Sequence, residues 1–159
     1  MNVINPLGPI EVVCVAERNI DPAIDVEASD IDKYLLTRDP SCLVIKAGMT
    51  PTKFVLKQLK AMYLSDVIEA HSAPSRRIML AFLTACHEVK LANGTSLVPA
   101  KLNPDPVYGV IKADEEFYQR VNDECGMDAI REMGYFIMRR AGVGAKGLGP
   151  FDWPPGSTS

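Results

Sequence analysis

The chain has 159 residues, of which 47% are hydrophobic and 23% are charged, and its net charge is −3. This balance is that of a soluble domain with a hydrophobic core, and the acidic net charge argues against nucleic acid as the main partner. We expect no membrane partner, because no apolar run approaches the length that spans a bilayer. The amino terminus lacks the pattern of a signal peptide, and the four cysteines have no C-x-x-C spacing, so we expect free thiols in a reducing cytoplasm.

The first third of the chain predicts an arm, a strand and a short helix. Residues 1–9 are rich in proline and glycine, and are expected to form an N-terminal arm. The β-branched run over residues 10–15 predicts a buried strand. An acidic stretch follows and leads into a helix that Ser29 or Asp30 can cap, and that continues to Leu36.

A second strand is predicted over residues 43–47, and the segment after it allows two interpretations. As a helix, it would begin with Thr50 as N-cap and Pro51 at the first helical position, where proline is tolerated. As a strand, it would place its aromatic and aliphatic side chains on one face. We favour a strand over residues 53–58, followed by a helix over residues 59–71.

The most apolar segment follows and predicts the central helix. Residues 76–91 carry apolar side chains around most of a helical circumference, so this helix should be buried, with Phe82 in the core. Asn93 and Gly94 provide a stop signal. The three prolines of residues 95–109 then predict a long surface connection.

Two further helices and a tail complete the predicted organisation. One helix is expected over residues 114–122, and a second over residues 127–141, separated by an interruption at Cys125 and Gly126. The fold class is therefore α+β, a small antiparallel sheet packed against three or four α-helices with extended N- and C-terminal arms. The predicted parts are an N-terminal arm, a single globular domain and a Gly/Pro-rich tail, over residues 1–9, 10–141 and 142–159.

No motif in the sequence defines a chemistry. The G-x-G-x-x-G pattern of residues 142–147 lacks the preceding strand and following helix of a dinucleotide site, so we expect no cofactor. Neither the cysteines and histidines nor the acidic residues 21–32 have the spacing of a zinc or EF-hand site, so we expect no metal. Cys86 and His87 are an adjacent nucleophile and base, but neighbours on a helix point about 100° apart. We interpret them as a core thiol and a rim histidine, not as catalytic residues.

The strongest candidate for partner binding is the tail. The single tryptophan, Trp153, lies with Phe151 among prolines, outside the predicted core. Aromatic side chains are common interface anchors, and a proline-stiffened segment loses less entropy on binding. Phe151, Trp153, Pro154 and Pro155 are therefore the predicted partner-binding residues. The sequence leaves open whether they dock on their own domain or on another molecule.

The segment Ser41–Leu59, in which Pro51-Thr52 is followed by Phe54 and Leu56, resembles the opening of small tailed-bacteriophage assembly proteins. Tail-assembly chaperones and virion accessory proteins are the groups concerned. The resemblance implies a β-hairpin leading into helices, no catalysis, and a protein partner that is another virion subunit or an unfolded tail protein. It also implies a location in the host cytoplasm during assembly or in the virion, and is compatible with a homo-oligomer.

The sequence thus predicts a non-enzymatic interaction or assembly protein that binds neighbouring subunits through its arms. The alternative is a small cytosolic enzyme that uses Cys86 and His87.

Overall fold

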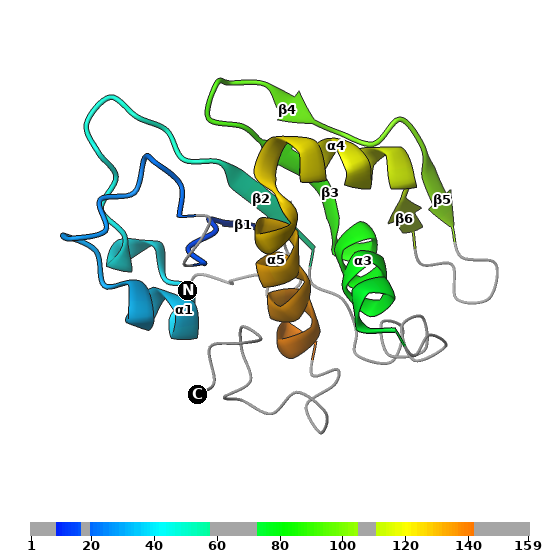
Figure 1. Ribbon diagram of the computed structural model, residues 1–159, viewed down its shortest axis with the longest axis horizontal. Coiled ribbons are helices and arrows are strands. Elements are labelled where there is room, and N and C mark those ends of the chain that lie inside the picture. Colours follow the sequence, from blue (N-terminus) through cyan, green and yellow to red (C-terminus); the bar gives the residue numbers. More distant parts are fainter. Residues whose placement is uncertain (1–8, 17–19, 58–72, 105–110, 142–159) are drawn as a thin grey trace, which may run out of the picture.

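The computed structural model describes residues 9–16, 20–57, 73–104 and 111–141, and has the predicted α+β class (Figure 1). The described residues form four α-helices, one 3-10 helix and two antiparallel sheets. The helices are α1 (Ile31–Thr37), α3 (Pro74–Ala85), α4 (Glu115–Cys125) and α5 (Met127–Arg140), with the 3-10 helix η1 at Pro40–Cys42. None of these helices combines the length and the apolar character needed to cross a bilayer.

The main sheet has four antiparallel strands in the order β1-β2-β3-β4, and α3, α4 and α5 lie on one of its faces (Figure 1). Its strands are β1 (Ile10–Val12), β2 (Lys53–Leu56), β3 (Cys86–Lys90) and β4 (Ser96–Leu97). β2 alternates as predicted for a strand buried on one side, because Phe54 and Leu56 are each 1% exposed and their neighbours are partly exposed. On the opposite face, Glu11 forms ion pairs with Lys53 and Lys90 of the neighbouring strands.

Phe82 of α3 is completely buried at the centre of the main core. Its ring contacts Phe54 of β2 edge-on, with centroids 6.1 Å apart, and stacks on Phe117 of α4 at 6.3 Å. Tyr118 completes the aromatic group at 6.2 Å. Phe82 therefore joins the sheet to α4, in agreement with its predicted central position.

The predicted helix over residues 76–91 is wrong in its last part. α3 ends at Ala85, and Cys86–Lys90 continue as β3, which pairs with β2 through Leu56↔Cys86 and Phe54↔Val89. An unbroken apolar run satisfies both a buried helix and a buried strand, so periodicity could not separate them. Asn93 and Gly94 lie in the turn between β3 and β4, where Gly94 has φ +90°.

Three further predictions, two of strands and one of a connection, need correction. β1 ends at Val12, and the buried residues 13–15 of the predicted strand 10–15 have no neighbouring strand in the described structure. The predicted strand 43–47 is an irregular segment with a single bridge, Ile24↔Ile45, so no hairpin joins it to β2. The predicted connection 95–109 contains β4 and also β5 (Leu102–Pro104), which pairs with β6 (Ile111–Ala113) in a second sheet.

Other boundaries agree with the sequence. Asp30 caps α1 by accepting a hydrogen bond from the Lys33 amide at 3.1 Å. The corner between α4 and α5 lies at Gly126, whose φ of +88° is a conformation that glycine adopts readily. The predicted helix 59–71 and the tail 142–159 lie outside the described residues, as does the arm 1–9 except for Pro9.

Residues 20–52 form an N-terminal lobe with a small core of its own, beside the main sheet (Figure 1). Ile24, Tyr34 and Cys42 pack there against Val13 and Val15, which follow β1. Two backbone hydrogen bonds hold the irregular segments of the lobe together, from Asp25 N to the Val44 oxygen and from Lys46 N to the Ala23 oxygen, each 2.8 Å long.

Candidate functional site

The residues predicted to bind a partner, Phe151, Trp153, Pro154 and Pro155, lie outside the described part of the chain. The same holds for the glycine motif 142–147. Partner binding by the tail therefore remains a prediction.

Cys86 and His87 lie on a strand, not on a helix as predicted. The register of β3 against β2 shifts between Val55↔Glu88 and Leu56↔Cys86, so His87 is the extra residue of a β-bulge. Cys86 is completely buried in the main core, whereas His87 is half-buried. His87 Nε2 lies 3.0 Å from the Leu83 carbonyl oxygen, which can only accept, so Nε2 carries the proton.

Burial affects the protonation of both groups. Burial raises the pKa of the Cys86 thiol, which keeps it protonated at neutral pH. Burial also lowers the pKa of His87, and the positive charge of Lys57 acts in the same direction. The sequence-based interpretation was a thiol in the core and a histidine at its edge. The burial of Cys86 and the partial exposure of His87 agree with this interpretation.

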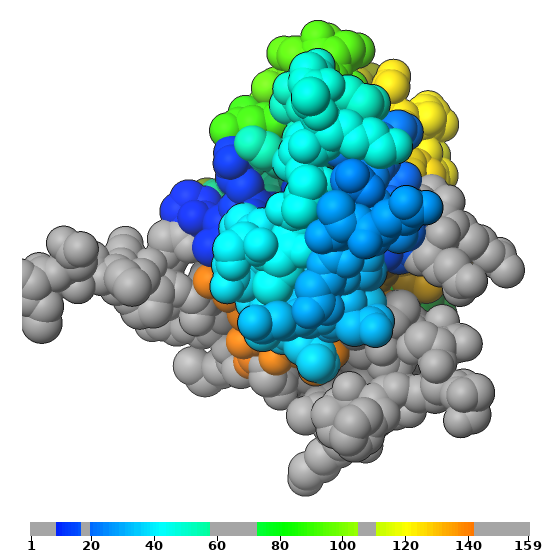
Figure 2. All heavy atoms as spheres, turned by 90° about the vertical axis from the view of Figure 1, so that its left-hand side faces the viewer, coloured from blue at the N-terminus to red at the C-terminus, as the bar shows by residue number. Residues whose placement is uncertain are grey.

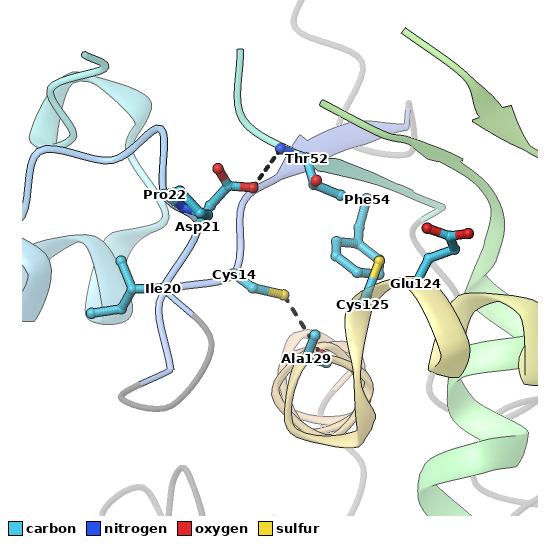
Figure 3. A pocket seen from close by; sticks show the side chains of 9 residues that line it. All are labelled: Cys14, Ile20, Asp21, Pro22, Thr52, Phe54, Glu124, Cys125 and Ala129. Carbon is cyan, nitrogen blue, oxygen red and sulfur yellow. Dashed lines mark hydrogen bonds between the residues drawn. The ribbon is translucent and has the colours of Figure 1, made fainter. Parts of the chain in front are cut away.

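A pocket of about 260 Å³ lies where the N-terminal lobe meets the α4–α5 corner (Figure 3). Figure 3 shows the Asp21 carboxylate turned toward Thr52, whose amide donates to it at 2.8 Å, and the Cys14 thiol turned toward α5. The nine residues that line it are Cys14, Ile20, Asp21, Pro22, Thr52, Phe54, Glu124, Cys125 and Ala129.

The pocket has acidic groups and thiols but no basic side chain in its lining. Burial, together with the negative charges of Glu124 and Asp21, raises the pKa of Cys125 to about 11, so this thiol is protonated at neutral pH. Across the part of the chain that the structure describes, no three metal-binding side chains converge. The pocket is therefore a small acidic recess without an activated nucleophile.

The N-terminal lobe exposes several large apolar side chains. Figure 2 shows the molecule from the side on which this lobe, the blue to cyan segment of the chain, lies. We call the exposed part of residues 20–52 the lobe surface, and the exposure of its large apolar side chains is 46% for Val26, 78% for Leu36, 43% for Val44, 39% for Ile45 and 44% for Met49. The paired segments 23–25 and 44–46 bring the chain around Val26 next to Val44 and Ile45.

The lobe is also the acidic part of the molecule. Residues 20–52 contain six acidic and three basic side chains, whereas the rest of the chain has equal numbers of both. Of the three basic residues, Arg38 is turned inward and paired with Glu132 of α5, which leaves Lys33 and Lys46 exposed. The lobe surface therefore combines exposed apolar side chains with a net negative charge.

A buried ion pair holds the lobe against the main domain. The Arg38 and Glu132 side chains are 5% and 0% exposed, and Glu132 also accepts hydrogen bonds from the Val15 amide at 2.9 Å and the Ala16 amide at 2.6 Å. The Arg38 guanidinium lies over the rings of Tyr34 and Phe136, 5.2 Å and 4.9 Å from their centroids. This pair fixes the lobe surface relative to the helices.

Sequence reasoning missed both the ion pair and the lobe surface. The sequence did contain a sign of the ion pair. The charged residue Glu132 lies between the apolar residues Ile130 and Met133 in the helix predicted over residues 127–141. The signal for the lobe surface was Val44 and Ile45, which were assigned to a predicted strand over residues 43–47.

Comparisons with known proteins give no relative: no model of a protein family, no curated protein and no solved structure matches the chain.

Proposed function

We propose that this protein is a non-enzymatic interaction subunit that binds another protein through its lobe surface. The observation that supports the proposal best is the group of five large apolar side chains exposed on one segment, residues 20–52. Single exposed apolar residues are common on any protein, but a group of them marks an interaction surface.

Its rigid attachment makes this surface suitable for docking. The buried Arg38–Glu132 pair and the hydrogen bonds of Glu132 to residues 15 and 16 connect the lobe to α5. A preorganised surface loses little conformational entropy when a partner binds. The lobe therefore presents Val44 and Ile45 in a defined position.

In its specific form, the proposal is an assembly role of the kind implied by the resemblance of Ser41–Leu59 to tailed-bacteriophage proteins. The partner would be a virion or tail subunit, in the host cytoplasm during assembly or in the virion. The predicted anchors Phe151 and Trp153 would supply a second contact. Self-association through the lobe surface is the homo-oligomeric version of the same role.

The experiment is affinity purification of the full chain from cells in which its partners are also produced. The double variant Val44→Ser/Ile45→Ser should lose a discrete partner, because it removes apolar area from the lobe surface. The matched control is Val98→Ser/Leu102→Ser, whose two side chains are each 49% exposed but lie outside the lobe. A chain shortened to residues 1–141 tests the tail separately.

Equal partner recovery by all four proteins would contradict the proposal. Sedimentation of the purified chain, with and without the lobe substitutions, distinguishes a second copy from a different partner. A shift of the wild type alone to a larger species would identify self-association.

A further inference from the structure

The turn that joins β3 to β4 contains an asparagine followed by a glycine, Asn93 and Gly94, and both are exposed. The Gly94 amide donates to the Leu91 carbonyl oxygen at 3.0 Å, and the φ of Gly94 is +90°, a conformation that glycine adopts readily. The Asn93 side chain is held in the same turn, because its Oδ1 accepts a hydrogen bond from the Thr95 amide at 2.9 Å.

We propose that Asn93 is a site of spontaneous modification in the folded protein: its side-chain amide deamidates to aspartate and isoaspartate, and the Thr95 amide assists this reaction. The proposal concerns described residues only and is independent of the proposed function. The reaction requires no enzyme, and its only co-reactant is water with its hydroxide ion.

The reaction begins at the main-chain nitrogen of Gly94, which loses its proton to hydroxide and attacks Asn93 Cγ. A bond forms between these two atoms, and negative charge develops on Oδ1. The bond from Cγ to Nδ2 then breaks, and Nδ2 takes a proton from water and leaves as ammonia, so that a succinimide ring remains. Water opens this ring at Cγ to give aspartate, or at the main-chain carbonyl of residue 93 to give isoaspartate. No atom is oxidised or reduced.

Two features of the turn favour this reaction at Asn93. Glycine has no Cβ beside the attacking nitrogen, so the approach to Asn93 Cγ is open. The Thr95 N–H already donates to Oδ1, which is the atom on which negative charge develops. A donor that is in place before the charge appears stabilises the transition state without reorganisation.

One hydrogen bond of the turn opposes the reaction, because the Gly94 N–H that must be lost donates to the Leu91 oxygen. Residues 92–95 are exposed, however, and the following strand β4 consists of two residues only. Local opening of a short exposed turn costs much less free energy than global unfolding. The Gly94 amide is therefore released for attack while the rest of the protein stays folded.

The two other asparagines in the described part of the chain lack these conditions. Asn103 is exposed, but it precedes Pro104, whose nitrogen carries no proton that could be lost. Asn122 precedes Asp123 inside α4, where the helix fixes the main chain. Both asparagines are therefore internal controls in the same molecule.

The products would affect the β3–β4 hairpin differently. Aspartate keeps an oxygen acceptor for the Thr95 amide, whereas isoaspartate lengthens the main chain of the turn by one carbon atom. The hairpin is closed by the Leu91 amide, which donates to the Thr95 oxygen at 2.8 Å, and it places the buried Leu97 opposite Val89. Isoaspartate therefore changes the main chain next to a pair that belongs to the core.

The test incubates the full-length protein at mildly alkaline pH in water labelled with a heavy oxygen isotope. Samples taken over time are digested in ordinary water and mapped by mass spectrometry, so that the label marks only the conversion that took place in the folded protein. We expect Asn93 to become labelled aspartate and isoaspartate at least about tenfold faster than Asn103 or Asn122 is converted.

Three variants test the two favourable features of the turn. Gly94→Ala should slow the conversion by at least about tenfold, because its Cβ hinders the attacking nitrogen. This variant should fold, since the added Cβ would have no atom within 4 Å. Thr95→Pro removes the N–H donor and should slow the conversion by roughly tenfold, whereas the matched control Thr95→Ala keeps the donor and should leave the rate unchanged. Thermal unfolding verifies that each variant is folded.

Three results would contradict the proposal. Conversion of Asn93 no faster than that of Asn103 and Asn122 would reject the site. Conversion that occurs only in urea-unfolded protein would show that the turn protects the amide. Equal rates for Thr95→Pro and Thr95→Ala would reject the contribution of the Thr95 amide. None of these results affects the proposed function, which the co-purification experiment decides.

Discussion

The Arg38 guanidinium lies 2.6 Å from the Glu132 carboxylate, and the two residues are 94 positions apart in the chain. Arg38 follows α1 and has φ +53°, a left-handed conformation that glycine usually occupies at the end of a helix. A non-glycine residue in this conformation is strained by about 1–2 kcal/mol. The ion pair with Glu132 gives a reason for an arginine at this position.

We therefore expect Glu132→Ala to destabilise the protein by about 3–5 kcal/mol, because it leaves the Arg38 charge and two amide groups without their buried acceptor. Urea denaturation measures the change in the free energy of unfolding. The matched control is Glu115→Ala, which breaks the exposed pair between Arg76 and Glu115 at 3.1 Å and should cost less than about 1 kcal/mol. Similar costs for the two variants would contradict a structural role of the buried pair.

Gly134→Ala should destabilise the protein although alanine is the better helix former. A Cβ at residue 134 of α5 would lie 2.7 Å from Ile78 Cγ2 and 3.3 Å from the Ile78 carbonyl oxygen of α3. The clash should cost about 1–3 kcal/mol, against a helix-propensity gain of about 1 kcal/mol. Thermal unfolding measures the balance.

The companion variant Gly134→Ala/Ile78→Ala tests the cause of that loss. Because alanine lacks the Cγ2 atom that the new Cβ would meet, the double variant should be more stable than the sum of the two single changes predicts. Strict additivity of the two changes would show that α3 and α5 do not meet at this point.

Protonation of His87 should weaken the folded state. Burial and Lys57 lower its pKa below the ordinary value of 6.5 in the folded protein, so the unfolded chain binds the proton more readily. Above pH 6.5, His87 is neutral in both states and the free energy of unfolding does not depend on its protonation. As the pH drops below this value toward the lowered pKa, the unfolded chain takes up the proton first, and the free energy of unfolding falls. Chemical denaturation at a series of pH values should show a smaller pH dependence for His87→Gln than for the wild type in this range.

The thiols should react in an order set by their burial. Cys125 is partly exposed with a pKa near 11, so an alkylating reagent should modify it slowly at neutral pH. Cys14 and Cys86 are buried and have raised pKa values, so they should react only after unfolding. Mass spectrometry of peptides after timed alkylation measures the order, and Cys125→Ser should remove the first modification. Fast alkylation of Cys86 in the folded protein would instead favour the alternative of an enzyme that uses Cys86 and His87.

Local signals in the sequence predicted several elements well. Asp30 before α1, the acidic first turn of α4 and Gly126 at the α4–α5 corner each act within a few residues of themselves. The alternation around Phe54 and Leu56 likewise identified β2. Each of these features depends on hydrogen bonds or on a repeat of apolar side chains within one short segment. The sequence of that segment was therefore enough to predict it.

The errors have one physical origin, which is that pairing between distant segments decided the structure. Cys86 to Lys90 became a strand because β2 offers them partners, and residues 43–47 remained irregular because they have only one bridge, to Ile24. Likewise, the amides of residues 13–15 are satisfied partly by side chains from α1 and α5, namely Tyr34 and Glu132, and not by a strand.

By itself, the sequence determined the α+β class, the positions of α1, α4 and α5, and the acidic character of residues 20–52, since composition, capping and periodicity are properties of short segments. Only the tertiary structure decided that α3 gives way to a strand, that Arg38 turns inward to Glu132, and that Val26, Val44 and Ile45 stay exposed. These features depend on which distant residues come into contact, because the free energy of burial and pairing belongs to the contact and not to either segment alone.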